Sequence, residues 1–322
     1  MKCQFLIGLP YHPPMPNAEQ TPATVHQRIL VTGASGFVGR AVVDALLARG
    51  KSVVAYVRTR SMTIAHPNLT VIQGDLFDPE RLTAAMVGCD GVVHLVGIIF
   101  ENRGKGVTFE RVHVEGTRAV VHAAKAEGVS RFVHMSALGA RLDAPARYQS
   151  TKFAAEQIVR QSGLAYTIFR PSLILGPAGD FTQQMTSWAK GQAIPWLFMP
   201  YFAKGVLGTG GASRVQPVAV DDLARVFADS IDLPQSLGRV FNLAGPTVMT
   251  WPEMYRAFST KLLGKPGRTL GIPLWYAGLI ARVTPGFLLP FNLDQVRMAA
   301  QDNVADTTEA QFDLNFRPGE AF

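Results

Sequence analysis

A tyrosine and a lysine placed four residues apart carry the clearest chemical signal in this 322-residue chain. Tyr148 and Lys152 stand in the sequence YQSTK, near the start of a helix predicted over 147–162. Residues i and i+4 share one helix face, so the phenol and the ammonium are expected to be neighbours. A nearby cation favours the phenolate, so we expect Lys152 to lower the pKa of Tyr148, which then acts as general acid or base. The alternative is that both side chains lie on a solvated helix face.

Ser136 is the third candidate catalytic residue. It directly follows a strand predicted over 131–135, with the sequence RFVHM. Ligands of parallel α/β sheets bind at the carboxyl ends of the strands, so the Ser136 hydroxyl is expected to orient a substrate oxygen. Lys152 is also placed to hold the ribose of a nicotinamide.

A glycine-rich turn is expected to hold the ligand on which these three residues act. It lies between a predicted strand over 29–31 and a predicted helix that ends at Gly50. Its sequence, TGASGFVG, contains Gly33, Gly36 and Gly39. Gly33 allows a tight turn, Gly36 leaves room for a pyrophosphate, and Gly39 lets the helix pack closely on the strand. The helix N-terminus offers free N–H groups to phosphate. The spacing G-x-x-G-x-x-G differs from the usual G-x-G-x-x-G, but its context predicts a dinucleotide site.

The residues after the second predicted strand indicate which dinucleotide is preferred. An NAD site needs an acidic group at the adenosine ribose, yet no Asp or Glu occurs between Lys51 and Gly74. The turn instead contains Arg58 and Arg60, and Arg40 follows the last glycine of the turn. Because Arg binds a 2′-phosphate through charge-assisted hydrogen bonds, NADP(H) is favoured over NAD(H). The alternative is that Arg58 and Arg60 are solvated turn residues.

The order of the predicted elements indicates an α/β, Rossmann-type, doubly wound parallel sheet. Short apolar strands alternate with helices up to residue 170, which is typical of a parallel sheet covered on both faces. The later half has more proline and longer loops, and is expected to form a smaller irregular substrate lobe with segments that return to the sheet. The predicted organisation is a flexible N-terminal extension over 1–27, a dinucleotide-binding domain over 28–175 and the smaller lobe over 176–322. Predicted elements lie at 52–57, 70–73, 79–86, 91–96, 109–127, 131–135, 147–162, 165–170, 221–231, 239–243, 252–263, 273–283 and 294–300.

Composition argues against several classes of function. A net charge of +7 without a run of consecutive Lys or Arg argues against nucleic acid as a partner. Two cysteines form neither a disulfide framework nor a metal cluster, which fits a reducing, cytoplasmic compartment. His94, His122 and His134 have no metal-ligand spacing, so structural roles and no metal site are expected.

Five motifs in order, TGASGFVG, Gly74-Asp75, MSALGA, YQSTK and FRPSLILGP, resemble the short-chain dehydrogenase/reductase superfamily of the extended or atypical type. The resemblance covers residues 28–245. It implies Ser136, Tyr148 and Lys152 as the catalytic triplet, Asp75 at the adenine and Pro171 near the nicotinamide. The whole cofactor site that we expect comprises Gly33, Ser35, Gly36, Phe37, Val38, Gly39, Arg40, Arg58, Asp75, Leu76, Val96, Gly97, Tyr148, Lys152 and Pro171.

One position departs from the superfamily pattern, because His113 stands where an Asn tied to a proton relay is frequent. Either His113 relays protons itself or the relay is absent. A narrower likeness, carried by SALGA, RPSLILGPAGDF and LLPFNLDQVRMAAQDNV, is to the subgroup of the NADPH-binding accessory subunit of respiratory complex I and its bacterial relatives. Some members of that subgroup are linked to ubiquinone biosynthesis.

The most apolar stretch, residues 269–293, is interrupted by Arg282 and three prolines and is too short for a membrane span. It is expected either to pack on the protein or to lie in a membrane interface, which would attach the protein to the inner face of a membrane. Two functions follow. One is an NAD(P)-dependent oxidoreductase or epimerase/dehydratase acting on an apolar or quinone-like substrate, bound beneath residues 171–211 near Met199. The other is a non-catalytic NADPH-binding accessory or assembly protein of respiratory complex I or ubiquinone biosynthesis.

Overall fold

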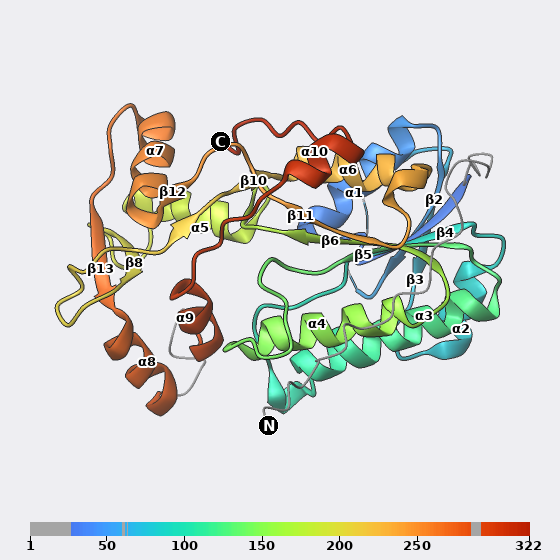
Figure 1. Cartoon of the computed structure of the whole chain (residues 1–322), viewed down its shortest axis with the longest axis horizontal. Coiled ribbons are helices and arrows are strands. Elements are labelled where there is room, and N and C mark those ends of the chain that lie inside the picture. The colour runs from blue at the N-terminus through green and yellow to red at the C-terminus, as the bar shows by residue number, and fades with distance from the viewer. Residues whose placement is uncertain (1–26, 60–61, 63, 285–290) are drawn as a thin grey trace, which may run out of the picture.

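A seven-stranded parallel sheet forms the centre of the computed structural model, which describes residues 27–59, 62, 64–284 and 291–322 (Figure 1). Its spatial order is β11-β6-β5-β4-β1-β2-β3, and all neighbouring strands run parallel. The strands are β1 (Arg28–Thr32), β2 (Ser52–Val57), β3 (Leu69–Gln73), β4 (Gly91–His94), β5 (Arg131–Met135), β6 (Ala165–Pro171) and β11 (Arg239–Leu243). The α/β doubly wound architecture predicted from the sequence is confirmed.

Helices cover both faces of this sheet, which explains why its central strands are apolar at nearly every position. One face packs on α1 and α6 and the other on α2, α3 and α4, as Figure 1 shows. Val31, Val93 and Val133 point into the first core, whereas Leu30, Val92 and Phe132 point into the second. These helices are α1 (Phe37–Ala48), α2 (Pro79–Met86), α3 (Gly116–Ala126), α4 (Arg147–Arg160) and α6 (Val220–Ser230).

The strand order reverses between β1 and β4, and this reversal creates the binding crevice of the fold. From β1 the chain builds β2 and β3 on one side, and then crosses to β4, β5 and β6 on the other. The helices that follow β1 and β4 leave toward opposite faces, so a gap opens at the carboxyl ends of these strands. The glycine-rich turn lies at this point.

A smaller lobe holds most of the chain after β6, at the left of Figure 1. Its core contains Leu175, Met185, Met199, Val215, Met254, Tyr255 and Phe258. Three two-stranded sheets join β7 (Ile174–Leu175) with β10 (Val218–Ala219), β8 (Met199–Ala203) with β13 (Thr269–Pro273), and β9 (Arg214–Val215) with β12 (Met249–Thr250). The remaining α-helices are α5 (Asp180–Ala189), α7 (Trp251–Leu263), α8 (Leu274–Val283), α9 (Leu293–Ala299) and α10 (Thr308–Asp313).

One predicted helix differs in kind from the structure. The segment predicted as a single helix over 109–127 begins with a π-helical stretch, Glu110–Glu115, before α3. π-Helical turns are rare and are frequent at functional sites, and this one holds His113. Within the described residues no helix combines the length and the apolar composition that a bilayer span requires.

Candidate functional site

A cleft of about 410 Å³ lies at the reversal of strand order, where the fold predicts a ligand. Eight of the expected cofactor residues line it: Gly33, Ser35, Gly36, Arg58, Asp75, Leu76, Val96 and Gly97. Tyr56, Val57, Thr59, Gly74, Phe77, Leu95, Ile98, Val107 and Val112 line it as well. The cleft is therefore built by the loops that follow β1, β2, β3 and β4.

The glycine-rich turn has the geometry that its spacing predicts. Gly33 has a φ of 74°, and its carbonyl oxygen accepts a hydrogen bond of 3.0 Å from the N–H of Gly36. A Cβ at Gly39 would lie 2.1 Å from that same oxygen, so a side chain there would force α1 away from the turn. The first residues of α1 thus stay close to β1, and the first turn of a helix leaves N–H groups free to bind a phosphate.

Four expected cofactor residues lie beside this cleft without lining it. The ring of Phe37 packs against the loop at Gly176 and Gly179, where an added Cβ would lie 3.0 Å from it. Val38 is buried in the core, Gly39 packs on the turn, and Arg40 is exposed. A contact of Phe37, Val38, Gly39 or Arg40 with a dinucleotide stays a prediction.

The loops after β2 and β3, where the sequence predicts the adenosine, combine an exposed arginine with a fixed acidic loop. Arg58 is exposed at the end of β2, and its carbonyl accepts a hydrogen bond of 3.1 Å from Gln73 Nε2. Tyr56 donates its hydroxyl to the carbonyl of Asp75 at 2.9 Å, and Phe77 N–H donates to Asp75 Oδ1 at 3.0 Å. The Tyr56 hydroxyl occupies the space of a Cβ at position 74, so only glycine fits there. Arg60 lies outside the described residues.

Lys152 reaches the carboxyl edge of the sheet from the first turns of α4. Its side chain is buried, and Nζ donates to the carbonyl of Met135 at 2.9 Å. A Cβ at Gly97 would lie 3.1 Å from this Nζ, which places the ammonium beside the cleft lining after β4. Burial lowers the pKa of Lys152 to about 8, against the opposing effect of the Glu156 carboxylate.

Tyr148 lies on the same helix face, and its ring contacts two neighbouring rings edge-on. The ring centroid lies 5.4 Å from that of His113 and 5.9 Å from that of Phe109. Burial raises the pKa of Tyr148 to about 12. The expectation that Lys152 lowers this pKa is therefore wrong in this arrangement, because loss of hydration dominates at the phenol.

Ser136 does not face the cleft. Its side chain is buried, and the hydroxyl donates to Glu156 Oε1 at 2.5 Å. Glu156 also accepts two hydrogen bonds from Arg170, of 2.7 Å from Nε and 2.6 Å from Nη2. In this arrangement the Ser136 hydroxyl ties the end of β5 to α4, and its expected role at a substrate oxygen stays a prediction.

His113 is buried between the cleft and α4. Nδ1 lies 2.9 Å from Thr151 Oγ1, and Nε2 lies 3.2 Å from the carbonyl oxygen of Ile98. Burial, assisted by the charge of Lys152, lowers the pKa of His113 to about 2, so the ring is neutral. A neutral imidazole with hydrogen bonds at both nitrogens positions Thr151 and the loop after β4.

The remaining expected residues are divided between the core and the surface. Pro171 is buried at the end of β6, and its carbonyl accepts a hydrogen bond of 2.9 Å from Leu138 N–H. Met199, expected near a substrate, is instead part of the core of the smaller lobe. His94 and His134 are buried, whereas His122 is exposed on α3.

Sequence reasoning missed Glu156 and Tyr56, and only one of them left a sequence signal. Glu156 follows Lys152 by four residues and Tyr148 by eight, so the helix face that predicted the Tyr–Lys pair extends to it. Tyr56 reaches Asp75 from a different strand, and no local pattern shows that contact.

Comparison with known proteins relates this chain to NAD(P)H-binding proteins. Residues 33–190 match the model of an NAD(P)H-binding family. The chain is 28% identical over 310 residues to the mitochondrial NADH dehydrogenase [ubiquinone] 1 alpha subcomplex subunit 9 of Arabidopsis thaliana, covering 89% of this chain and 73% of that protein. A 3-beta-hydroxysteroid dehydrogenase of Mycolicibacterium neoaurum is 43% identical over 113 residues, which are 33% of this chain and 31% of the relative. The chain thus spans less than a third of this second relative.

Solved structures share the fold. An NADPH-dependent quinone oxidoreductase of Escherichia coli, complexed with NADPH, has a TM-score of 0.68 and 22% identity over 91% of this chain and 96% of that chain. A nucleoside-diphosphate-sugar epimerase of Staphylococcus aureus has a TM-score of 0.68 and 18% identity over 92% of this chain and 98% of that chain. The family match and the cofactor-bound neighbour support binding of a nicotinamide dinucleotide by this chain, and its position in the cleft stays a prediction.

Proposed function

We propose that the chain, which resembles the short-chain dehydrogenase/reductase superfamily and matches an NAD(P)H-binding family over residues 33–190, is an NADP(H)-dependent reductase of an apolar, quinone-like compound. The observation that carries this proposal is the position of α4. It brings Lys152 to the end of the cleft at Gly97 and Tyr148 to the same helix face, four residues earlier. A nicotinamide held in the cleft would then lie beside a proton donor.

Preference for the phosphorylated cofactor is supported by Arg58. Arg58 lines the cleft and is exposed, so an ion pair there would not be opposed by the desolvation of a buried group. An arginine binds a phosphate with two parallel charge-assisted hydrogen bonds. The carboxylate that would repel this phosphate is missing from residues 52–73.

The residues of the chain can perform the proton part of a carbonyl or quinone reduction. When bound, the reduced nicotinamide supplies a hydride to the acceptor. Tyr148 retains its proton at neutral pH because burial raises its pKa to about 12, so it can donate that proton to the oxygen that gains charge. Lys152 is fixed by Met135 and holds positive charge near this oxygen.

An apolar substrate fits the surroundings of the cleft better than a sugar nucleotide does. The lining of the cleft includes five apolar residues, Leu95, Val96, Ile98, Val107 and Val112. The solved quinone oxidoreductase and the complex I subunit, whose names refer to quinone or ubiquinone, point to the same chemical class. We place this substrate between α4 and the lobe that follows residue 175.

The test is turnover of NADPH with a series of quinones by the native protein and by Tyr148→Phe. Losing the proton donor should lower turnover by about 10²- to 10⁴-fold and leave NADPH affinity unchanged. Tyr166→Phe is the matched control, because it removes a tyrosine hydroxyl from β6 at a position outside the cleft lining. This variant should retain full turnover. Equal turnover by Tyr148→Phe and the native protein would exclude Tyr148 as the donor.

A second candidate function is a non-catalytic NADPH-binding accessory or assembly protein of a respiratory complex or of ubiquinone biosynthesis, at the inner face of a membrane. It is favoured by the engagement of Ser136 with Glu156, which occupies one expected catalytic hydroxyl, and by the complex I relatives. A native protein that binds NADPH tightly, reduces no quinone and co-purifies with membrane proteins would establish this function instead.

A further inference from the structure

Helix α8 exposes an apolar stripe on the smaller lobe. Trp275, Leu279 and Val283 are spaced by four residues and so share one face, and their exposed fractions are 57%, 51% and 72%. Only Ala277 of this helix is buried. A helix that is apolar and yet exposed usually has a partner that covers it.

The loop after β8 extends the same surface. The indole N–H of Trp275 donates to the carbonyl of Val206 at 3.0 Å, which fixes this loop against the start of α8. Val206 and Leu207 are exposed by 75% and 81%. We call this surface the α8 face, and define it as Val206, Leu207, Trp275, Leu279 and Val283.

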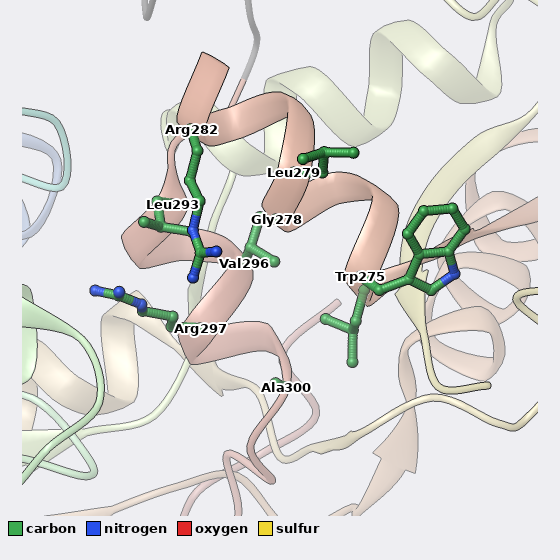
Figure 2. Close-up of a pocket in the computed structure, with 9 residues that line it drawn as sticks. Trp275, Gly278, Leu279, Arg282, Leu293, Val296, Arg297 and Ala300 are labelled. Carbon is green, nitrogen blue, oxygen red and sulfur yellow. The ribbon is translucent and has the colours of Figure 1, made fainter. Parts of the chain in front are cut away.

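A groove of about 510 Å³ runs between α8 and α9 beside this face. Figure 2 shows the side chain of Arg282 extending from α8 toward α9, where Arg297 lies. Leu279, Leu293 and Val296 supply apolar lining. Arg297 lies 3.8 Å from Asp294, whereas Arg282 has no ion-pair partner among the residues that the structure describes. The groove therefore combines an apolar lining with cationic groups at its edge.

The two stretches of sequence that contain the α8 face carry only basic charges. Residues 181–220 and 254–293 contain no Asp or Glu. They contain eight basic residues: Lys190, Lys204, Arg214, Arg256, Lys261, Lys265, Arg268 and Arg282. Arg214 is paired with Asp302, at 2.7 Å. A surface of this charge attracts anionic groups and repels cationic ones.

We infer that the α8 face docks on the surface of an anionic lipid bilayer. An apolar helix face with a Trp, flanked by Arg and Lys, suits the boundary between acyl chains and headgroups. Trp275, Leu279 and Val283 enter that boundary, and Arg282 pairs with lipid phosphate. Each basic residue near such a surface strengthens attachment, and salt weakens it.

Docking by α8 would also bring the candidate active site to the membrane, a consequence that rests on the proposed function. Asn292, just before α9, donates Nδ2 to the carbonyl of Ile99 at 3.1 Å. Asp294 Oδ1 accepts a hydrogen bond of 2.9 Å from the N–H of Arg147, the residue before Tyr148. The helix paired with α8 therefore contacts the first turn of α4, and an apolar substrate could pass from the bilayer to this end of the site.

The experiment is sedimentation of the full chain with vesicles of phosphatidylcholine alone, or of phosphatidylcholine with phosphatidylglycerol, at low and at high salt. The native protein should bind the anionic vesicles and be released by salt. The double variant Trp275→Ser/Leu279→Ser should bind at least about tenfold more weakly, and Arg282→Gln about fivefold more weakly. Phe312→Ser removes another exposed aromatic ring, 87% exposed on α10, and should bind like the native protein.

Failure to bind anionic vesicles, or equal binding by the double variant, overturns the inference. Self-association of the native protein that the double variant abolishes, without vesicle binding, would identify a second copy as the partner and also overturn it. Titration with NADPH separates this result from the proposed function: a protein that binds NADPH and no vesicles keeps its cofactor site and loses only its membrane surface.

Discussion

Lys152 and Tyr148 have pKa values far from their ordinary ones because the protein packs around them. Lys152 titrates at about 8 and Tyr148 at about 12, so at neutral pH one is charged and the other keeps its proton. A protonated phenol beside a charged ammonium suits a reduction, because the phenol must then donate its proton. The sequence predicted the two residues and their common helix face, but not the direction of the Tyr148 shift, because burial depends on Phe109 and His113 from a distant segment.

Lys152→Met should increase the stability of the fold and at the same time abolish turnover. Below pH 8 the folded protein carries a buried charge that the unfolded chain hydrates freely. Between about pH 8 and pH 10.5 the unfolded chain holds a proton on Lys152 that the folded protein has lost. The free-energy cost of burying this charge is therefore at its full value below pH 8 and disappears as pH rises through that window. A shift of this size corresponds to about 3 kcal/mol, and the lost hydrogen bond to Met135 offsets part of it.

We therefore expect Lys152→Met to raise the free energy of unfolding at pH 7 by about 1–3 kcal/mol while it abolishes turnover. Denaturant unfolding at several pH values measures this, and the advantage should vanish above about pH 10.5. A variant that is less stable than the native protein at pH 7 would show that the Lys152 charge stabilises the fold.

At the scale of elements, local sequence patterns predicted the bounds of single strands but not the contacts between distant segments. The strands predicted at 52–57, 131–135 and 239–243 have the observed bounds, because their apolar runs are bounded by turn residues. The pairing of β8 with β13 joins segments about seventy residues apart, and the hydrogen bond between Asp294 and Arg147 spans 147 positions. Such contacts form only in the folded chain, so the α8–α9 groove could not be predicted.

The pairing of β4 with β5 places two buried histidines side by side, and within the described part of the chain only one of them has hydrogen-bond partners. His94 contacts Thr32 Oγ1 at 2.6 Å and Thr117 Oγ1 at 3.1 Å. His134 stacks on His94 with ring centroids 5.4 Å apart, and neither of its ring nitrogens has a partner among the described residues. Unpaired buried polar atoms are destabilising, so the two positions should respond oppositely to an apolar side chain.

His134→Leu should raise the free energy of unfolding by about 1–2 kcal/mol, because it removes unpaired polar atoms without breaking a bond. His94→Leu is the matched control and should lower the free energy of unfolding by about 1–3 kcal/mol, because it leaves Thr32 and Thr117 unpaired. Thermal and denaturant unfolding at pH 7.5 measure both. If both substitutions destabilise equally, His134 has a partner that the described residues do not supply.

At the scale of the whole molecule, the buried histidines determine how steeply the stability of the fold decreases as pH falls. Burial lowers the pKa of His94 to about 3 and that of His113 to about 2, and it lowers the pKa of His134 well below its usual value. The unfolded chain binds a proton at each of these residues below about pH 6.5, whereas the folded protein does not. Stability contributed by the neutral rings is therefore full above pH 6.5 and is lost as pH falls.

We expect the free energy of unfolding to fall by about 3–4 kcal/mol per pH unit below pH 6, the slope for two to three protons. Denaturant titrations at pH 7.5, 6 and 5 should show this, because domains of this kind are stable by only about 5–15 kcal/mol. His122→Gln, at an exposed position on α3, should retain the full slope, and His134→Leu should reduce it by one proton. A slope near zero would mean that the rings gain protons within the fold.

The cofactor site of the whole molecule is tested most directly by titration with NADPH and with NADH. The native protein should bind NADPH more tightly. Arg58→Asp should weaken NADPH binding by about 10- to 100-fold and NADH binding by less than about threefold, because only NADPH has the phosphate that Arg58 would bind. Arg118→Asp makes the same charge change on the exposed side of α3 and should alter neither affinity. Equal losses for both nucleotides, or no binding of either by the native protein, would contradict an NADP(H) site in this cleft.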